Sequence, residues 1–385
     1  MLNHFINNQN FMKTNQLILA AALVALAACT KDSIDYNANT LDNEIGFNAV
    51  TRKASKVTTD NDKIVGTATY PETCDFMVWG WQSPENDFSE FAGENASTAP
   101  NFMSGLVIEY TTGRDTGRPA AWRNATKYYY WPNTGTIGFM GFHPSTAVPS
   151  NWTPSWDAAN HKATASLSNY SVTGKLTTDL MFAYGAGTRE TAKVNMVFHH
   201  ALSQVAVKVK TDADYTTDGV SFSITGLKFQ NIALAGDVTY ANDAITWGPA
   251  NAADSWTQSS ECEYSDADQT VTSTAADYGS AILMVPQPAN VLVWSAAVGT
   301  EGEEGYVAPQ LTDSVQTILE IGYTMQQGNN AAISGTIHVA APQLWEVGKR
   351  YLYTINFKLN EILFNPSVDQ WGDWVAVNIT ADTLI

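Results

Sequence analysis

Cys29 is the residue whose type and surroundings carry the most specific chemistry in this sequence. It ends the segment Leu26-Ala27-Ala28-Cys29, in which small residues precede a cysteine, the pattern of a bacterial lipoprotein cleavage site. Lys13 supplies a positive charge, and the apolar run 17–26 is about ten residues long, half of the roughly 20 needed to span a bilayer. We therefore expect residues 1–28 to be a signal peptide and the Cys29 thiol to receive a lipid that anchors the exported precursor to a membrane.

Catalytic and metal-binding patterns are missing from the sequence. It contains no G-x-S-x-G, H-E-x-x-H, phosphate-loop or dinucleotide motif. His199 and His200 are adjacent, so on a strand they point to opposite faces and cannot grip one metal ion together. Asp266 and Asp268 could offer oxygen atoms to calcium, but acidic pairs at this spacing are common in turns. The sequence thus predicts no enzyme, no metal site and no cofactor.

The net charge limits the binding partners that can be expected, and the cysteine content bears on disulfide formation. The formal net charge is −18, and removing residues 1–28 removes Lys13 alone, which gives −18 − 1 = −19. Nucleic acids and anionic membrane surfaces need clustered positive charge, so both are disfavoured as partners. Cys74 and Cys262 lie far apart in the sequence, and we expect them to be buried free thiols rather than a disulfide.

After residue 42 the sequence has the pattern of an all-β protein. Short runs of alternating apolar residues are separated by Gly, Asn, Asp, Thr and Pro, which predicts antiparallel β-sandwich structure. After Gly226 the apolar phase shifts by one residue, which predicts a bulge. A chain of 385 residues is long enough for two domains. The polar break at 185–191 places the boundary near 190. The predicted parts after the signal peptide are a flexible tether 29–42, an N-terminal domain 43–190 and a C-terminal domain 191–385.

The aromatic residues allow two interpretations. Trp79, Trp81, Tyr128, Tyr130 and Trp131 lie in strand-like runs, where aromatic side chains usually fill a sandwich core. If they were exposed instead, they could stack on sugar rings. The spacing favours the core.

Taken in order, several motifs resemble those of a known family, the Mfa-like fimbrillins that build type V pili of Bacteroidales-type bacteria. The motifs that carry this resemblance are 43–47 (NEIGF), 76–80 (FMVWG), 129–132 (YYWP), 139–144 (FMGFHP), 198–205 (FHHALSQV), 284–287 (MVPQ), 345–351 (WEVGKRY) and 368–371 (VDQW). The resemblance implies two tandem transthyretin-like β-sandwich domains. It also implies assembly by donor-strand exchange, in which a protease removes the first strand and a terminal strand of another subunit replaces it.

The sequence contains the parts that this assembly requires. Ile45, Phe47 and Ala49 form one apolar face of a first strand within 43–52, which could be removed. Arg52 and Lys53 follow and form a site for an Arg-directed, trypsin-like protease. Near the other end, the apolar face of a candidate donor strand is formed by Val375, Val377 and Ile379. An ordinary loop residue at Arg52, and a terminal strand that completes its own sandwich, are the alternatives.

The function expected from the resemblance is that of a structural pilus subunit serving adhesion. The expected partners are other pilin subunits, the outer membrane through the lipid of the precursor, and host or bacterial surface glycans or proteins. The expected location is the outer membrane surface and, after processing, the fimbria. The alternative function is a surface glycan-binding lipoprotein or a pilus tip adhesin. Stalk, tip and anchor positions all remain open.

Overall fold

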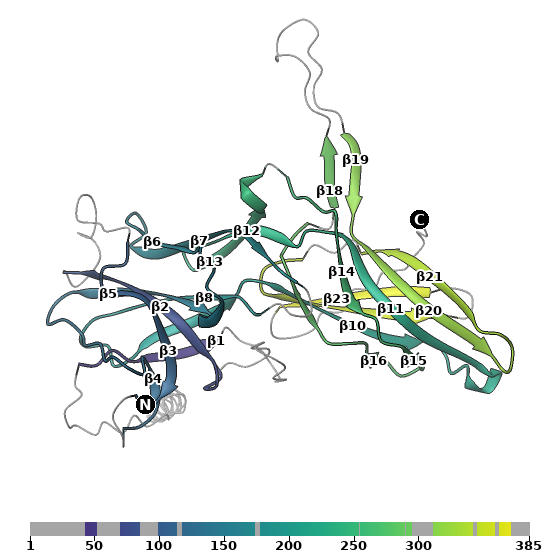
Figure 1. Cartoon of the computed structure of the whole chain (residues 1–385), viewed down its shortest axis with the longest axis horizontal. Coiled ribbons are helices and arrows are strands. Elements are labelled where there is room, and N and C mark those ends of the chain that lie inside the picture. The colour runs from purple at the N-terminus through teal and green to yellow at the C-terminus, as the bar shows by residue number, and fades with distance from the viewer. Residues whose placement is uncertain are drawn as a thin grey trace, which may run out of the picture. The chain divides into compact units, whose positions relative to one another are not determined.

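A computed structural model of the chain describes residues 43–51, 70–84, 99–113, 118–173, 178–253, 255–288, 290–294, 311–341, 345–358 and 362–370. These residues form strands and short 3-10 turns, with no α-helix among them, which confirms the all-β class (Figure 1). From Ile45 onward they belong to one unit. The two transthyretin-like domains divided near residue 190 stay a prediction. Strands β7 (Lys162–Ser171) and β12 (Ala235–Ala241), which lie on either side of that position, pair in one sheet.

The N-terminal strands close into a barrel. In order around the barrel they are β1 (Phe47–Thr51), β4 (Ala121–Arg123), β3 (Met103–Thr111), β2 (Asp75–Ser83), β5 (Thr136–His143), β8 (Met181–Gly187) and β9 (Val194–His200). Closure depends on β1, which pairs antiparallel with β4 and parallel with β9. This parallel pair departs from the purely antiparallel pairing that the alternation predicts.

A second group of strands forms a sheet beside β5. It comprises β13 (Ala244–Pro249), β12 (Ala235–Ala241), β7 (Lys162–Ser171) and β6 (Thr153–Asp157). Side chains from this sheet and from β2, β5 and β8 form one apolar cluster, which we call the second core. The cluster inside the barrel is called the barrel core.

The remaining described strands form a β-sandwich and a hairpin. One sheet contains β16 (Ala276–Asp277), β10 (Ser203–Thr211), β22 (Lys349–Phe357), β23 (Ile362–Gln370) and β17 (Ile282–Met284). The other contains β14 (Ser260–Ser265), β15 (Gln269–Val271), β11 (Val220–Ile232), β20 (Ile318–Gln327) and β21 (Ile333–Ala340). A shared apolar core joins the two sheets. The predicted irregularity at Gly226 is confirmed, because the register of β11 against β20 shifts between Ile224 and Gly226. Separately, β18 (Asn290–Trp294) pairs with β19 (Leu311–Gln316).

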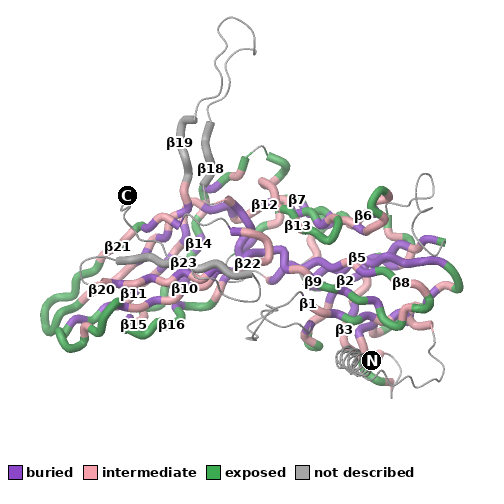
Figure 2. The backbone as a smooth tube through the Cα atoms, turned by 180° about the vertical axis from the view of Figure 1, so that it is seen from behind, coloured by how far each residue is buried: buried purple, intermediate pink, exposed green. Residues whose placement is uncertain are grey.

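Strand β5 is buried along its whole length (Figure 2). Ile137 and Phe139 face the barrel core, and Met140 and Phe142 face the second core. Glycines on both faces leave room for large neighbours. A Cβ atom at Gly138 would lie 2.8 Å from the Trp156 ring, and one at Gly141 would lie 2.9 Å from the terminal methyl of Met196. The glycines of this strand therefore allow both cores to pack directly against its backbone.

The substitution Gly138→Ala should destabilise the chain by about 1–3 kcal/mol, because the added methyl overlaps the Trp156 ring. The matched control is Gly248→Ala, since a Cβ atom there meets nothing within 4 Å. Urea unfolding followed by tryptophan fluorescence measures both variants. Equal stability of the two variants would contradict the packing described for β5.

Candidate functional site

The first strand fills a slot in the wall of the barrel. Ile45, Phe47 and Ala49 alternate along it and are 3%, 1% and 3% exposed. The Phe47 ring meets Phe76 and Phe139 edge to face, with ring centroids 6.0 and 5.3 Å apart. This burial confirms the apolar face expected for the first strand.

Main-chain and side-chain hydrogen bonds fix the register of β1. Its five residues pair in parallel with the first five of β9, from Phe47 opposite Val194 to Thr51 opposite Phe198. The Gly46 carbonyl accepts the Val194 amide at 2.9 Å. On the outer face, the Asn48 amide nitrogen donates to the Asn195 side-chain oxygen at 3.0 Å. The strand is therefore held by specific pairing as well as by apolar burial.

Removing β1 would open the barrel between β4 and β9. Burial of Ile45 and Phe47 contributes about 1.5–3 kcal/mol each relative to exposure. Loss of the strand would expose this apolar surface and leave β9 with an unpaired edge, a combination that favours addition of another strand. The arrangement can thus act as an acceptor for an extended segment with a similar apolar face.

The proposed processing and donor residues lie outside the described part of the chain. These residues are Cys29, Arg52, Lys53, Val375, Val377 and Ile379. Thr51, the last residue of β1, is buried and directly precedes Arg52. The structure therefore describes the strand that would be removed and leaves the cleavage and donor positions as predictions.

The aromatic residues considered for sugar stacking are mostly in the core. Trp79 is 7% exposed and Trp131 is 5% exposed, so neither offers a ring face to a ligand, and this site assignment is wrong. Residues 128–131 form no extended strand, and Tyr130 makes an isolated bridge with 50% of its surface exposed. The expectation that Tyr130 fills a core is also wrong, because without a strand the alternation of faces does not hold.

A buried polar cluster is present that sequence reasoning missed. The Tyr70 hydroxyl lies 2.5 Å from Nδ1 of His143 and donates to the Asp75 carbonyl at 2.5 Å. Nearby, His200 pairs with Asp179 at 2.7 Å. Burial lowers the pKa of His143, although Asp75 and Asp179 act in the opposite direction. These residues are single polar positions in separate segments, so nothing in their spacing marks them as neighbours.

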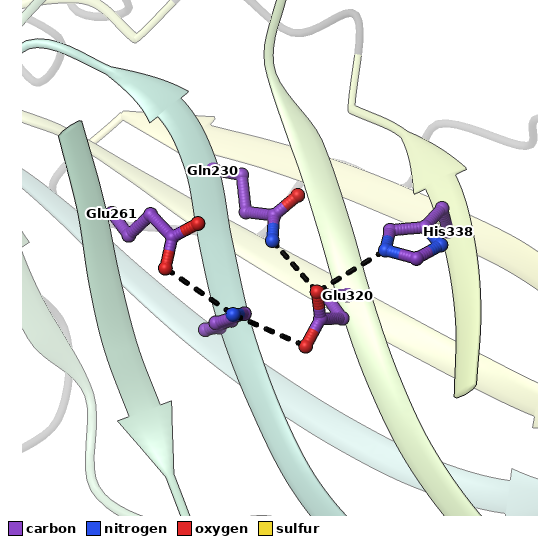
Figure 3. Close-up of polar contacts among 5 residues, drawn as sticks. Gln230, Glu261, Glu320 and His338 are labelled. Carbon is purple, nitrogen blue, oxygen red and sulfur yellow. Dashed lines mark hydrogen bonds and ion pairs between the residues drawn. The ribbon is translucent and has the colours of Figure 1, made fainter. Parts of the chain in front are cut away.

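A polar ladder crosses the outer face of the sandwich (Figure 3). Lys228 bridges Glu261 and Glu320, with both nitrogen–oxygen distances 3.2 Å, and His338 lies 3.1 Å from Glu320. Gln230 donates to the same Glu320 carboxylate at 2.7 Å. Partial burial raises the pKa of Glu320, but the hydrogen bonds from Lys228 and His338 outweigh it and lower the pKa overall. The ladder links four neighbouring strands, and its carboxylates are engaged by protein groups.

The described residues contain neither a metal-binding cluster nor a helix that could span a membrane. No group of three or more His, Cys, Asp or Glu side chains there could hold a metal ion. Within the same residues, no helix has the length and apolar character to cross a membrane. Cys74 and Cys262 form no disulfide, as the sequence predicts; Cys262 is buried as expected, whereas Cys74 is half-buried. Of the adjacent histidines, His200 is buried and His199 is half-buried.

The comparison with protein families decides the identity of the chain. A model described as fimbrillin-like matches residues 75–371, which is most of the chain. The chain belongs to the fimbrillin-like family. Its membership indicates a structural role, as a subunit of a pilus on the cell surface, rather than an enzymatic one.

One solved structure has a similar fold. A fimbrial protein from Bacteroides vulgatus has 19% sequence identity and a TM-score of 0.57, and the match covers 86% of this chain and 99% of that one. A Bacteroides uniformis protein with an inferred role in cell adhesion has 14% identity and a TM-score of 0.44, covering 85% of this chain and 99% of that one. The search of curated proteins found no match.

Substituting Phe47 tests the contribution of β1 to the intact chain. Phe47→Ala should cost about 3–5 kcal/mol, because it leaves a cavity against Phe76 and Phe139. Val50→Ala in the same strand is the control, and since Val50 is half-buried it should cost about 1 kcal/mol. Equilibrium urea unfolding of the uncleaved chain gives both values. Similar losses for the two variants would mean that β1 is not anchored through Phe47.

The lowered pKa of His143 predicts loss of stability on acidification. The unfolded chain takes up a proton near pH 6.5, whereas the folded chain resists it, so the unfolding free energy should fall as pH drops below about 6.5. His143→Gln should flatten this dependence between pH 7.5 and 5.5. His161→Asn is the control, because this half-buried residue has a φ of 54° that asparagine tolerates. An unchanged slope in His143→Gln would assign the pH dependence to other groups.

Proposed function

We propose that this fimbrillin-like chain is exported as a lipoprotein precursor and polymerises into a pilus by donor-strand exchange. In this scheme Cys29 carries the lipid that holds the precursor at the outer membrane. A protease cleaves after Arg52, and the lipid, the tether and β1 are lost together. The C-terminal segment of another subunit then occupies the place of β1.

The observation that carries this proposal is the position of β1. It is the first described strand, it contributes buried side chains to the barrel core, and it ends at Thr51 immediately before Arg52. Cleavage after Arg52 would sever β1 from everything that follows. Because β1 closes the barrel, its departure would leave a long apolar slot rather than a trimmed terminus.

The spacing of the C-terminal segment supports it as the replacement strand. Val375, Val377 and Ile379 repeat the two-residue period of Ile45, Phe47 and Ala49. Asn378 follows the middle apolar residue, as Asn48 follows Phe47. In the orientation and register of β1, Asn378 would meet Asn195 of the accepting subunit, which is the partner of Asn48 in the uncleaved chain.

The alternative function, a surface glycan-binding lipoprotein or tip adhesin, loses its first expected site. Burial of Trp79 and Trp131 removes them as stacking surfaces. An anchor subunit, by contrast, would keep its lipid and β1. N-terminal sequencing of the protein extracted from cells distinguishes a stalk subunit from an anchor subunit, since a stalk subunit begins at Lys53 and an anchor begins at Cys29.

Limited digestion of the purified precursor tests polymerisation directly. A trypsin-like protease that cuts after Arg52 should convert the monomer into a ladder of oligomers on a gel without boiling, because the opened slot accepts strands from neighbours. The double variant Arg52→Ala with Lys53→Ala is the control and should stay monomeric. A monomer that persists after cleavage, verified by an N-terminus at Lys53, would refute the scheme.

A truncated chain identifies the donor. Deleting residues 375–385 should abolish the ladder after cleavage. The thermal unfolding midpoint of the uncleaved chain should stay unchanged, because the terminal strand then serves a neighbour and not its own sandwich. A drop in that midpoint on deletion would support the alternative that the segment completes its own domain.

A further inference from the structure

A pocket lined by half-exposed indole rings lies away from β1. Its volume is about 370 Å³, within the range of about 300–1,000 Å³ found for small-molecule sites. Trp247 and Trp256 line it together with Pro286 and Pro288, and charged residues contribute through Glu346 and Lys349. Both tryptophans pack against the second core and remain partly exposed.

The two indole rings are held in place by the strand beneath them. A Cβ atom at Gly236 in β12 would lie 3.0 Å from the Trp247 ring and 3.1 Å from the Trp256 ring. Glycine at this position therefore lets both rings lie against the backbone. The Trp247 ring nitrogen also donates to the Ala201 carbonyl at 2.7 Å, which fixes the orientation of that ring.

The loop that leads to Trp256 is ordered by one carboxylate. Asp237 accepts the backbone amides of Asn251 and Ala252 at 2.9 and 2.7 Å. Both of these loop residues have positive φ values, 60° and 53°. The hydrogen bonds to Asp237 compensate for this less favourable backbone conformation, so the turn at Asn251 and Ala252, which precedes Trp256 in the sequence, is held in place.

The opposite wall is equally fixed. Gln287 and Trp345 exchange two main-chain hydrogen bonds, 2.9 and 3.0 Å long. The Gln287 side chain is buried and exchanges two more with the Ala233 backbone, 2.6 and 2.8 Å long. Pro286 and Pro288 on either side are thereby held at the pocket surface.

Four main-chain amides of this wall, those of Gln287, Trp345, Glu346 and Lys349, are already engaged. The two prolines have no N–H group, and the Gln287 and Trp345 amides bond each other's carbonyls. The Glu346 amide donates to the Tyr351 hydroxyl at 2.7 Å, and the Lys349 amide donates to the Glu346 carbonyl at 3.2 Å. Addition of a peptide strand, which requires free main-chain groups, is therefore disfavoured along this wall.

The side chains of the pocket provide flat apolar faces and one charged pair. The Lys349 ammonium donates to the Glu346 carboxylate, and these side chains are 27% and 44% exposed. A carboxylate accepts from hydroxyl groups and an ammonium donates to them, so the pair can bind adjacent hydroxyls of one ligand. Indole rings offer apolar faces to C–H groups on the same ligand.

We propose that this pocket binds a pyranose sugar ring. The C–H face of the sugar packs on the Trp256 ring beside Trp247, and its hydroxyls bond Glu346 and Lys349. The pocket is complete in the uncleaved chain with β1 in place, so this proposal does not depend on strand exchange. Its success or failure is therefore separate from that of polymerisation.

Saturation-transfer NMR of the intact, uncleaved chain tests the proposal with the methyl pyranosides of glucose, galactose, mannose, fucose and N-acetylglucosamine. At least one should bind saturably. Trp256→Ala should weaken that binding at least tenfold, because it removes a stacking face, and Glu346→Gln should weaken it severalfold. Tyr130→Ala is the matched control, since it removes an exposed aromatic ring elsewhere and should leave binding unchanged.

Two outcomes overturn the proposal. The first is the absence of saturable binding to any of the five sugars. The second is binding that stays within twofold of the unmodified chain in both Trp256→Ala and Glu346→Gln while their thermal unfolding midpoints match it. The Glu346→Gln variant keeps the test decisive if loss of the Trp256 ring disturbs the fold, because glutamine preserves the size of the side chain.

Discussion

The pairing of β1 with β9 is the constraint on which the N-terminal half of the described chain depends. Phe47 and its alternating neighbours contribute the apolar burial, and the parallel register with β9 brings them to the interior. Residues far apart in the sequence are joined by this pairing, as the Asn48–Asn195 contact illustrates with a separation of 147 positions. Neighbouring strands could not close the barrel without it.

The same constraint gives the proposed loss of β1 its physical consequence. A strand buried on one face and paired along its edge leaves behind a surface of defined shape and polarity. The apolar positions left by Ile45, Phe47 and Ala49 would recur at every second residue. The side-chain oxygen of Asn195 would mark one position of the register. In the proposed strand exchange an incoming segment would have to satisfy both conditions, so the slot would discriminate among extended segments through spacing and through one polar contact.

Much of this could be predicted from local patterns. The alternation of Ile45, Phe47 and Ala49 identified the first strand, and the phase shift at Gly226 identified a register irregularity. What could not be predicted depends on contacts between distant residues. Trp79 and Phe76 are both buried although they face opposite sides of β2, because a core lies on each side. The Tyr70–His143 contact joins positions 73 apart, and the Trp247–Trp256 pocket depends on a glycine in a neighbouring strand. No short-range signal encodes these arrangements.

Strand β5 has a consequence for the lifetime of an opened subunit. Phe139 of this strand faces the slot that β1 fills, while Met140 and Phe142 anchor the strand from behind in the second core. The floor of an emptied slot is thus clamped by packing that cleavage does not touch. An opened subunit would therefore keep a preorganised acceptor surface, because β5 could not move into the empty slot. The entropy cost of ordering during strand addition would then fall mainly on the incoming strand.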